Sequence, residues 1–231
     1  MKWFITFGAG GPNYTEAGYR LLNQSKNVEL FDKTSLYTED FLKKDVEFWN
    51  RHKDFIEKNR RGYGYWLWKP YIIKKTMEQM NDGDVLLYLD CGCEIDIRKK
   101  QEISAFLDNV KSEHIICTST GCFEQHFNKM DLVCKFNLTI DSSQIQSAAG
   151  AILFHVCDKT RHFIEEWYEQ GCEYHNIDDT PSIAPNYSGF FEHRHDQSIF
   201  SLLLKKYELY SNASLFHCIT YERNRTGISR L

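Results

Sequence analysis

The segment that most constrains the fold is VLLYL at residues 85–89, which lies between the turn sequence NDGD and a single aspartate, Asp90. An uninterrupted apolar run of this length is typical of a strand buried on both faces of a parallel sheet. A carboxylate that directly follows such a strand must be paired, bind a metal or hydrogen-bond a ligand, because an isolated buried charge is too costly. We therefore expect Asp90 at the edge of a sheet, where it either serves the function or caps the next turn.

The rest of the chain alternates short β-branched or aromatic runs with amphipathic segments, which is the pattern of α/β folds. We predict a single domain over residues 1–231 with a mixed, mostly parallel, Rossmann-like central sheet and helices on both faces. In such sheets ligands bind outside the carboxyl ends of the strands, so the glycine-rich loop 8–11 and residues 90–94 should border one crevice. The expected strands are 2–7, 28–31, 85–89, 114–118 and 151–155, and the expected helices are 14–25, 38–59, 71–80, 99–110, 159–170 and 196–206.

Charge and cysteine content argue against several classes of protein. The net charge is −4, from 28 basic and 32 acidic residues, so no global field favours nucleic acid or an anionic membrane. Without a run of 18 apolar residues or a cleavage signature near the start, we expect a cytoplasmic protein with no integral membrane segment. The eight cysteines are then expected to be reduced. The C-x-C pair of Cys91 and Cys93 has poor spacing for structural zinc.

Candidate metal ligands follow the buried strand directly. Asp90, Glu94 and Asp96 lie close together in DCGCEID and could share a divalent cation. Oxygen ligands of this kind suit Mg²⁺ or Mn²⁺. Near the C-terminus, His217 could be a further ligand or an ordinary histidine, and Arg223 and Arg225 could neutralise phosphate.

A second polar cluster, HRHDQ at residues 193–197, directly precedes an apolar helical run. Asp196 could simply be the N-cap of that helix. Equally, ionisable groups at a helix start could serve a reacting hydroxyl and an anionic leaving group together. The earlier GAGG loop lets backbone N–H groups approach a phosphate, but it matches neither the dinucleotide nor the P-loop fingerprint.

Three stretches together, GYWLWKPYII at 64–73, DVLLYLDCGCEI at 84–95 and HDQSIFSLL at 195–203, resemble GT-A type glycosyltransferases of capsule, lipopolysaccharide and giant-virus glycan pathways. The resemblance runs in order from the first strand to the HDQS helix. It implies a GT-A fold in which residues 1–97 bind the nucleotide and residues 98–231 hold the sugar and acceptor. It also implies a hexosyltransferase-like enzyme whose donor is a nucleoside diphosphate sugar, expected to be uridine-linked, and whose acceptor is a hydroxyl of a glycan or glycolipid.

The same resemblance implies roles for individual positions. Asp90 would be the first acid of a DXD motif, and Asp196 would be the general base or a positioning acid. Lys69 would point its charge at the donor phosphates while Tyr65, Trp66 and Trp68 pack beneath the nucleotide site. The implied donor-binding residues are Thr6, Phe7, Gly8, Lys69, Asp90, Cys91 and Gly92, and the implied sugar or acceptor residues are Lys129, Asp131, Ala149, Gly150, His195 and Gln197.

The chain departs from the family at the second acid of the motif, where Gly92 stands. The resemblance still implies Mn²⁺ or Mg²⁺, with Asp90, Glu94 and His217 as the expected ligands. The missing acid leaves open a catalytically silent module that binds a sugar nucleotide or glycan. A sugar nucleotidyltransferase is a third reading, which the absence of a lysine after the first strand disfavours. The HDQS motif is compatible with either inversion or retention of configuration.

Overall fold

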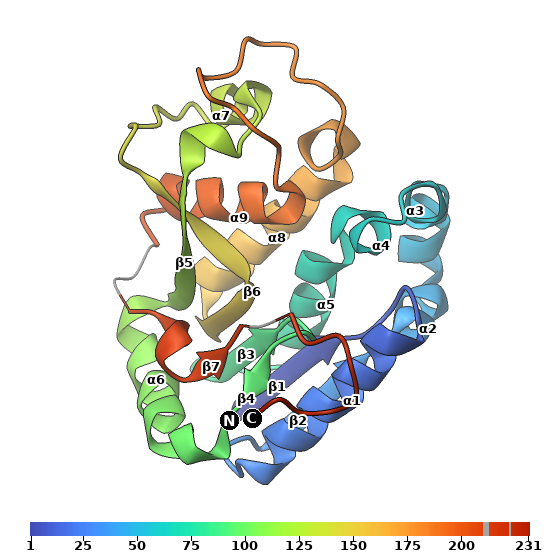
Figure 1. The fold of residues 1–231 in the computed structure, drawn as a ribbon, viewed down its shortest axis with the longest axis vertical. Helices are drawn as coiled ribbons and strands as arrows, with labels where there is room; N and C mark the ends of the chain where they lie inside the picture. The colour runs from blue at the N-terminus through green and yellow to red at the C-terminus, as the bar shows by residue number, and fades with distance from the viewer. Residues whose placement is uncertain (210–212, 222) are drawn as a thin grey trace.

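The computed structural model describes residues 1–209, 213–221 and 223–231, and its centre is a five-stranded sheet (Figure 1). Strand β1 (Lys2–Phe7) pairs in parallel with β2 (Lys33–Tyr37) and with β3 (Val85–Leu89). Strand β6 (Ile145–His155) runs antiparallel to both of its neighbours, β3 and β5 (Ile115–Phe123). The order is β2-β1-β3-β6-β5, so β6 alone is reversed, which confirms the mixed, mostly parallel sheet.

Helices cover both faces of the sheet, as predicted (Figure 1). Leu21 and Leu107 from two helices of one face join an apolar core with β3, while Ile72 and Trp167 from two helices of the other face join a second, larger core. Burial of such apolar surface is the main driving force for folding. The helices are α1 (Pro12–Asn27), α2 (Glu39–Lys44), α3 (Val46–Lys58), α4 (Gly62–Tyr65), α5 (Trp68–Met77), α6 (Lys100–Glu113), α7 (Met130–Lys135), α8 (Asp158–Cys172) and α9 (His195–Lys206).

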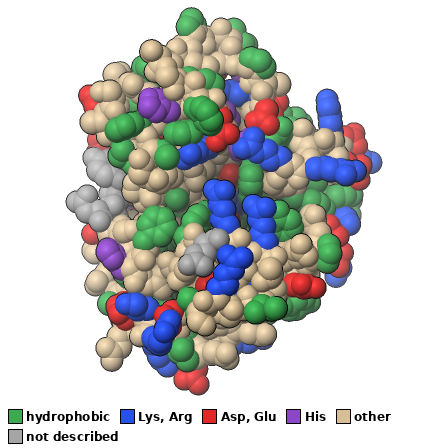
Figure 2. Space-filling model, in the orientation of Figure 1, with side chains coloured by type: hydrophobic (Ala, Val, Ile, Leu, Met, Phe, Trp, Pro, Cys, Tyr) green, Lys and Arg blue, Asp and Glu red, His purple; other side chains and the backbone are tan. Residues whose placement is uncertain are grey.

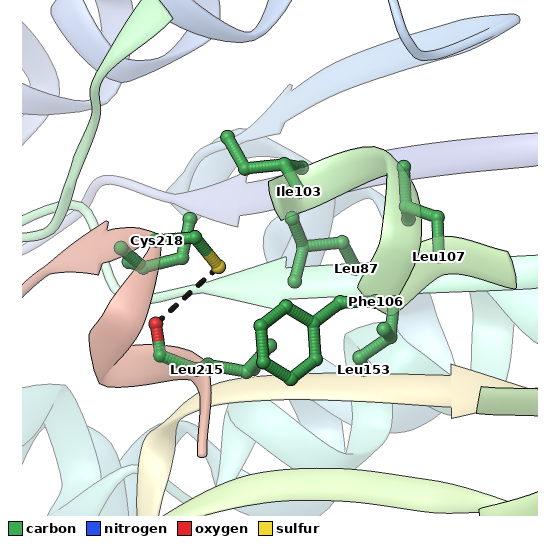
Figure 3. Close-up of a pocket in the computed structure, with 8 residues that line it drawn as sticks. Leu87, Ile103, Phe106, Leu107, Leu153, Leu215 and Cys218 are labelled. Carbon is green, nitrogen blue, oxygen red and sulfur yellow. Dashed lines mark hydrogen bonds between the residues drawn. The ribbon is translucent and has the colours of Figure 1, made fainter. Parts of the chain in front are cut away.

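Strand β3 is the centre of both cores, as its sequence predicts, because all five of its residues are buried. A second, two-stranded sheet joins β4 (Glu94–Ile95) to β7 (Ile219–Thr220) near the C-terminus. This C-terminal part packs on the smaller core, where Leu87, Phe106 and Leu215 line a small apolar cavity (Figure 3). Both halves expected from the resemblance, 1–97 and 98–231, contribute strands to the one central sheet. Among the residues described, no helix combines the length and the apolar character that a membrane crossing requires.

Two expected elements differ from the structure by more than their bounds. The strand predicted at 28–31 is wrong, because Val28 instead caps α1 with its N–H on the carbonyl of Gln24, and β2 begins at Lys33. The single helix predicted over 38–59 is divided, because the side chain of Asp45 accepts a hydrogen bond from the N–H of Phe48 and starts α3 afresh.

The aromatic run before α5 contains an unusual backbone. Residues 62–66 all have positive φ, between 53° and 85°, and form a left-handed turn. Its hydrogen bonds run from the N–H of Tyr65 to the carbonyl of Arg61 at 2.8 Å and from Trp66 to Gly62 at 3.1 Å. Glycine is needed at 62, where a Cβ would lie 2.4 Å from the ring of Trp66, and at 64, where it would lie 2.7 Å from a side-chain carbon of a neighbouring helix. Left-handed backbone costs about 1–2 kcal/mol for each other residue, so packing must stabilise this turn.

Candidate active site

A buried lysine joins two carboxylates beyond the carboxyl end of β3. The ammonium nitrogen of Lys69 lies 2.8 Å from Asp196 Oδ2 and 3.3 Å from Asp90 Oδ1. It also donates a hydrogen bond to the carbonyl oxygen of Ala149 at 3.1 Å. The three charged residues come from α5, the end of β3 and the start of α9, so the fold brings together groups that are far apart in the sequence.

Asp90 is the exposed member of this group. Its backbone N–H continues the pairing of β3 with β6 by donating to Gly150 O at 2.7 Å. The hydroxyl of Tyr88 donates to Asp90 Oδ1 at 2.5 Å and fixes one edge of the carboxylate. The side chain is 29% exposed, so the carboxylate is held by the protein and still open to a ligand.

Asp196 is the buried member, with a side chain 4% exposed. It is not the N-cap of α9, because Arg194 holds that position and its N–H donates to Ser198 Oγ at 2.9 Å. Burial raises the pKa of Asp196 to about 6, although the charge of Lys69 opposes that rise. Burial also lowers the pKa of Lys69, but the charges of Asp196 and Asp90 outweigh it and hold the pKa above its ordinary value. Lys69 therefore stays charged at neutral pH while Asp196 can change its charge near pH 6.

The glycine-rich loop borders the same end of the sheet. The N–H of Gly8 donates to Tyr37 O at 2.9 Å, and a Cβ at Gly8 would lie 2.6 Å from the carbonyl oxygen of Tyr14. The side chains of Thr6 and Phe7, two of the predicted donor contacts, are buried, and Phe7 stacks on Trp68 with ring centroids 3.9 Å apart. Because these two side chains are buried, the part that can face a ligand here is the backbone of the glycine-rich loop between β1 and α1.

Gly92, at the position of the second acid in the DXD motif that the sequence resembles, lies directly beneath another segment of the chain. A Cβ at this position would lie 3.0 Å from Arg223 Cα, and the N–H of Asn224 donates to Gly92 O at 2.9 Å. Arg20 ties the same two segments together, since its guanidinium donates to the carbonyls of Cys91 at 2.8 Å and Asn224 at 3.0 Å. A side chain at position 92 would press on the backbone of this C-terminal segment, which would have to shift by a few tenths of an ångström.

Glu94 holds the C-terminal segment in place. Its buried carboxylate lies 3.0 Å from Arg20 and accepts hydrogen bonds from Asn224 Nδ2 and Ser229 Oγ at 2.6 Å and from the N–H of Arg230 at 3.1 Å. Burial would raise its pKa, but these hydrogen bonds outweigh burial and lower the pKa to about 2. The carboxylate of Glu94 is thus held by α1 and the C-terminal segment.

The residues expected to bind a metal do not form a metal site. Of the residues placed in the structure, the one group of at least three His, Cys, Asp or Glu side chains close enough to share an ion is His114, His155 and Cys157, and it does not include Asp90. Glu94 is bound by the C-terminal segment, and His217 is exposed on a short turn that ends at this residue. A cation beside Asp90 would have one carboxylate of the predicted set, and that carboxylate already lies 3.3 Å from the ammonium nitrogen of Lys69. These residues do not fit a divalent ion held by protein ligands.

The predicted sugar contacts Lys129 and Asp131 hold a loop. The ammonium of Lys129 donates to His175 O at 2.7 Å and to Asp178 Oδ1 at 3.0 Å. Asp131 accepts from the N–H groups of Ile183 and Ala184, both at 2.7 Å. The long loop at residues 177–189 is therefore held to the protein at several points.

The remaining predicted sugar residues lie next to Asp196. Gln197 Nε2 donates to Gln146 Oε1 at 2.8 Å, and the N–H of Ala149 donates to Gln197 Oε1 at 3.4 Å. His195 stacks on Tyr65 of the left-handed turn, with centroids 4.7 Å apart, and its Nε2 lies 3.0 Å from Asp179.

Tyr221 packs against the predicted sugar residue Gly150. A Cβ at Gly150 would lie 2.1 Å from the hydroxyl oxygen of Tyr221, so no larger residue fits there. Burial raises the pKa of Tyr221, and the charge of Asp90 adds to the rise. Sequence reasoning missed Tyr221 because no motif surrounds it.

Basic side chains complete the site. Figure 2 shows Lys and Arg side chains gathered around a hollow in the middle of the face on which the C-terminal segment lies. Arg223 and Arg225 are exposed on that segment, and the guanidinium of Arg225 lies 5.4 Å from the ring centroid of Tyr14, in the first turn of α1 that follows the glycine-rich loop. Arg225 thus lies near the glycine-rich loop, and Arg223 lies next to Gly92.

Comparison with known proteins gives structural neighbours but no sequence family. No family model matches the chain, and no curated protein sequence is significantly similar to it. Mouse xyloside xylosyltransferase 1 is 12% identical with a TM-score of 0.48, over 93% of this chain and 86% of that one. A glycosyltransferase involved in glycosylation of the major capsid of PBCV-1 is 9% identical with a TM-score of 0.41, over 72% and 65%. The galactosyltransferase LgtC, solved with donor and acceptor sugar analogs, is 12% identical with a TM-score of 0.43, over 86% and 69%. Because the sequence identities are 12% or less and the TM-scores are below 0.5, these neighbours do not assign a function to the chain. The assignment has to rest on the geometry of the site.

Proposed function

We propose that the chain is a glycosyltransferase that moves a sugar from a nucleoside diphosphate sugar, expected to be uridine-linked, to a hydroxyl group of a glycan or glycolipid. The observation that carries the proposal is the arrangement of Asp90, Lys69 and Asp196 at the carboxyl edge of β3. In α/β sheets this edge, next to a glycine-rich loop, is where ligands bind. A partly exposed carboxylate fixed by a buried ion pair there has no evident structural purpose.

The donor diphosphate would lie between the glycine-rich loop and the C-terminal segment. Backbone N–H groups of the loop can approach its oxygens closely because Gly10 and Gly11 carry no side chains. Arg223 and Arg225 supply the positive charge that the leaving diphosphate needs as the bond to the sugar breaks. Lys69 does not reach the phosphates in this proposal, since its ammonium is buried and its charge is used by two carboxylates.

The donor sugar would lie over Asp90 and the start of α9. Asp90 would accept hydrogen bonds from the sugar with its exposed edge. Asp196 is too buried to meet a bulky acceptor, so we assign it as the positioning acid that holds Lys69 and, through it, Asp90. Gln197 and Gln146 would form the neighbouring polar wall. Orientation of the two substrates in this way is a large part of the catalysis of group transfer.

The test is release of nucleoside diphosphate from a panel of nucleotide sugars, with and without a mixed glycan acceptor. We expect Asp90→Asn to reduce the rate by about 100-fold, on the order of the loss of one charged transition-state contact. We expect Asp196→Asn to raise the donor KM as well as lower kcat, as a positioning role requires. Asp108→Asn is the matched control, because this exposed residue of α6 pairs with Lys2 at the start of β1, at 2.9 Å.

The same assay distinguishes a glycosyltransferase from the alternative function, a catalytically silent module that binds a sugar nucleotide or glycan. Its supporting observation is that Gly92 replaces the second motif acid and that the backbone at Arg223 crowds this position. A binder would be stabilised thermally by a nucleotide sugar and would release no diphosphate under any condition of the panel. Release that is unchanged in Asp90→Asn would contradict the placement of the active site.

A further inference from the structure

A cluster of soft ligand atoms lies at the opposite end of the sheet from Asp90. His114 directly precedes β5, His155 ends β6, and Cys157 is the N-cap residue of α8. One ligand atom from each residue lies within 4.8 Å of the other two, and all three residues are partly buried. Because His155 pairs with Val85 and Ala151 pairs with Leu89, the cluster is separated from the candidate active site by the length of β3. That distance is about 13 Å at about 3.3 Å per residue.

The backbone and a neighbouring hydroxyl hold these three residues in register. The N–H of His155 donates to His114 O at 2.9 Å. Thr160 Oγ1 donates to His155 O at 2.7 Å and accepts from the N–H of Cys157 at 3.1 Å. The imidazole rings of the two histidines are nearly parallel, at 11°, with centroids 6.0 Å apart. The cluster is therefore formed by regular secondary structure and needs little rearrangement to bind a ligand.

The side-chain contacts within the cluster are weak for a purely structural role. Cys157 Sγ lies 3.8 Å from His114 Nδ1 and 3.7 Å from Thr160 Oγ1, both long contacts. The Nδ1 atom of His155 is buried and makes no hydrogen bond within the described chain. An unpaired buried nitrogen of this kind is costly unless a ligand completes it.

We infer that His114, His155 and Cys157 form a binding site for a transition-metal ion, with Zn²⁺ the best match, and that solvent fills the fourth position. Two imidazoles and a thiolate are the ligands that Zn²⁺ and its neighbours prefer, whereas Mg²⁺ and Mn²⁺ prefer oxygen. Zinc bonds of about 2.0 Å to nitrogen and about 2.3 Å to sulfur place those two atoms about 3.5 Å apart in a tetrahedral site. The observed 3.8 Å between Cys157 and His114 is close to that spacing.

The bound ion would join two parts of the chain that are distant in sequence: the end of α6, and the short connection between β6 and α8. Its effect would therefore be on stability, since an ion that binds only the folded chain shifts unfolding by mass action. This site is independent of the proposed transfer reaction and remains testable if that proposal fails.

The experiment is titration of the chelator-treated protein with Co²⁺, followed by competition with Zn²⁺. We expect one ion per chain and a thiolate-to-cobalt charge-transfer band that Zn²⁺ abolishes. Zn²⁺ at a hundredfold excess over its Kd should raise Tm by about 5 to 10 °C.

Two variants preserve the local fold while removing a ligand. Cys157→Ser keeps a favoured N-cap residue without the thiolate. His114→Asn keeps a residue that accepts the positive φ of 64° at this position. Each should weaken Co²⁺ binding at least tenfold and remove the Zn²⁺-induced rise in Tm, and Cys157→Ser should also lose the charge-transfer band. Cys134→Ser, which removes an exposed cysteine elsewhere, should change nothing. Binding that survives both ligand variants, or that is lost equally in the control, would overturn the assignment.

Discussion

Replacing Lys69 by methionine tests the central pair of the site, because methionine keeps the length of the side chain and removes its charge. Lys69 is 3% exposed and lies within 3.3 Å of both Asp196 and Asp90. Breaking a buried ion pair by removing one partner costs about 3–5 kcal/mol, because the other charge stays buried without compensation. For a chain of this size that corresponds to a fall in Tm of about 6 to 20 °C.

The loss of stability should depend on pH with a definite sign. The pKa of Asp196 in the folded protein is about 6, above its ordinary value, so folding takes up a proton and stability falls as pH rises towards 6. In the Lys69→Met variant this pKa rises further, because the lysine charge that lowers it is gone. Between pH 6 and the higher pKa of the variant, the difference in unfolding free energy should therefore grow by about 1.4 kcal/mol per pH unit.

Urea denaturation of both proteins at pH 6, 7 and 8 measures this difference. Lys74→Met is the matched control, since Lys74 lies on the same helix and pairs with Glu165 at 3.0 Å and Glu78 at 3.7 Å but is 30% exposed. Exposed pairs contribute about 1 kcal/mol or less, and we expect no pH dependence from this control over the same range. A Lys69→Met cost that is below 1 kcal/mol, or that is flat between pH 6 and pH 8, would refute the buried coupling of Lys69 to Asp196.

Four further outcomes follow from the site. First, kcat/KM for donor turnover should fall as pH drops through about 6, because Asp196 then loses the charge that holds the lysine; a pH profile of diphosphate release checks this. Second, Gly92→Asp should lower Tm and bring no Mn²⁺-dependent gain in activity, since the new side chain meets the backbone at Arg223; thermal shift with and without Mn²⁺ decides it. Third, Glu94→Gln should destabilise the protein by about 3 kcal/mol at pH 7 and by much less near pH 2, because the carboxylate contributes stability above its ordinary pKa and loses it as pH falls towards about 2; urea denaturation at both pH values measures the difference. Fourth, Arg225→Gln should raise the KM for the nucleotide sugar about tenfold in steady-state kinetics and leave Tm unchanged, and an unchanged KM would remove this arginine from the donor site.

The sequence predicts the sheet and the position of Asp90 because both depend on local pattern. An uninterrupted apolar run such as VLLYL is compatible with few environments, and the residue that ends it must lie at the sheet edge. The error at β2 has a similarly local cause. Val28 and Leu30 look like a strand, but Val28 is the C-cap of α1 and Leu30 packs against the smaller core before β2 begins at Lys33.

The roles of the charged residues could not be predicted in the same way, because burial and partners are properties of the folded chain. Lys69 resembles a phosphate ligand in sequence, yet its partners are contributed by segments far along the chain. Glu94 resembles a metal ligand, and its partners Ser229 and Arg230 lie near the C-terminus, where no motif draws attention. The two glycines in GYGY are compatible with positive φ at their own positions. Nothing in the local sequence indicates that the two tyrosines and the tryptophan of residues 62–66 also adopt positive φ.

The left-handed turn at residues 62–66 should tolerate a different set of substitutions from an ordinary helix. In a saturation library, ordinary helical positions favour alanine and leucine over glycine. Residues 62–66 should show the reverse ranking, with glycine and asparagine best retained and valine, isoleucine and threonine most depleted. A short window in which substitution preferences invert would reveal the backbone geometry from survival counts alone, without any structural measurement.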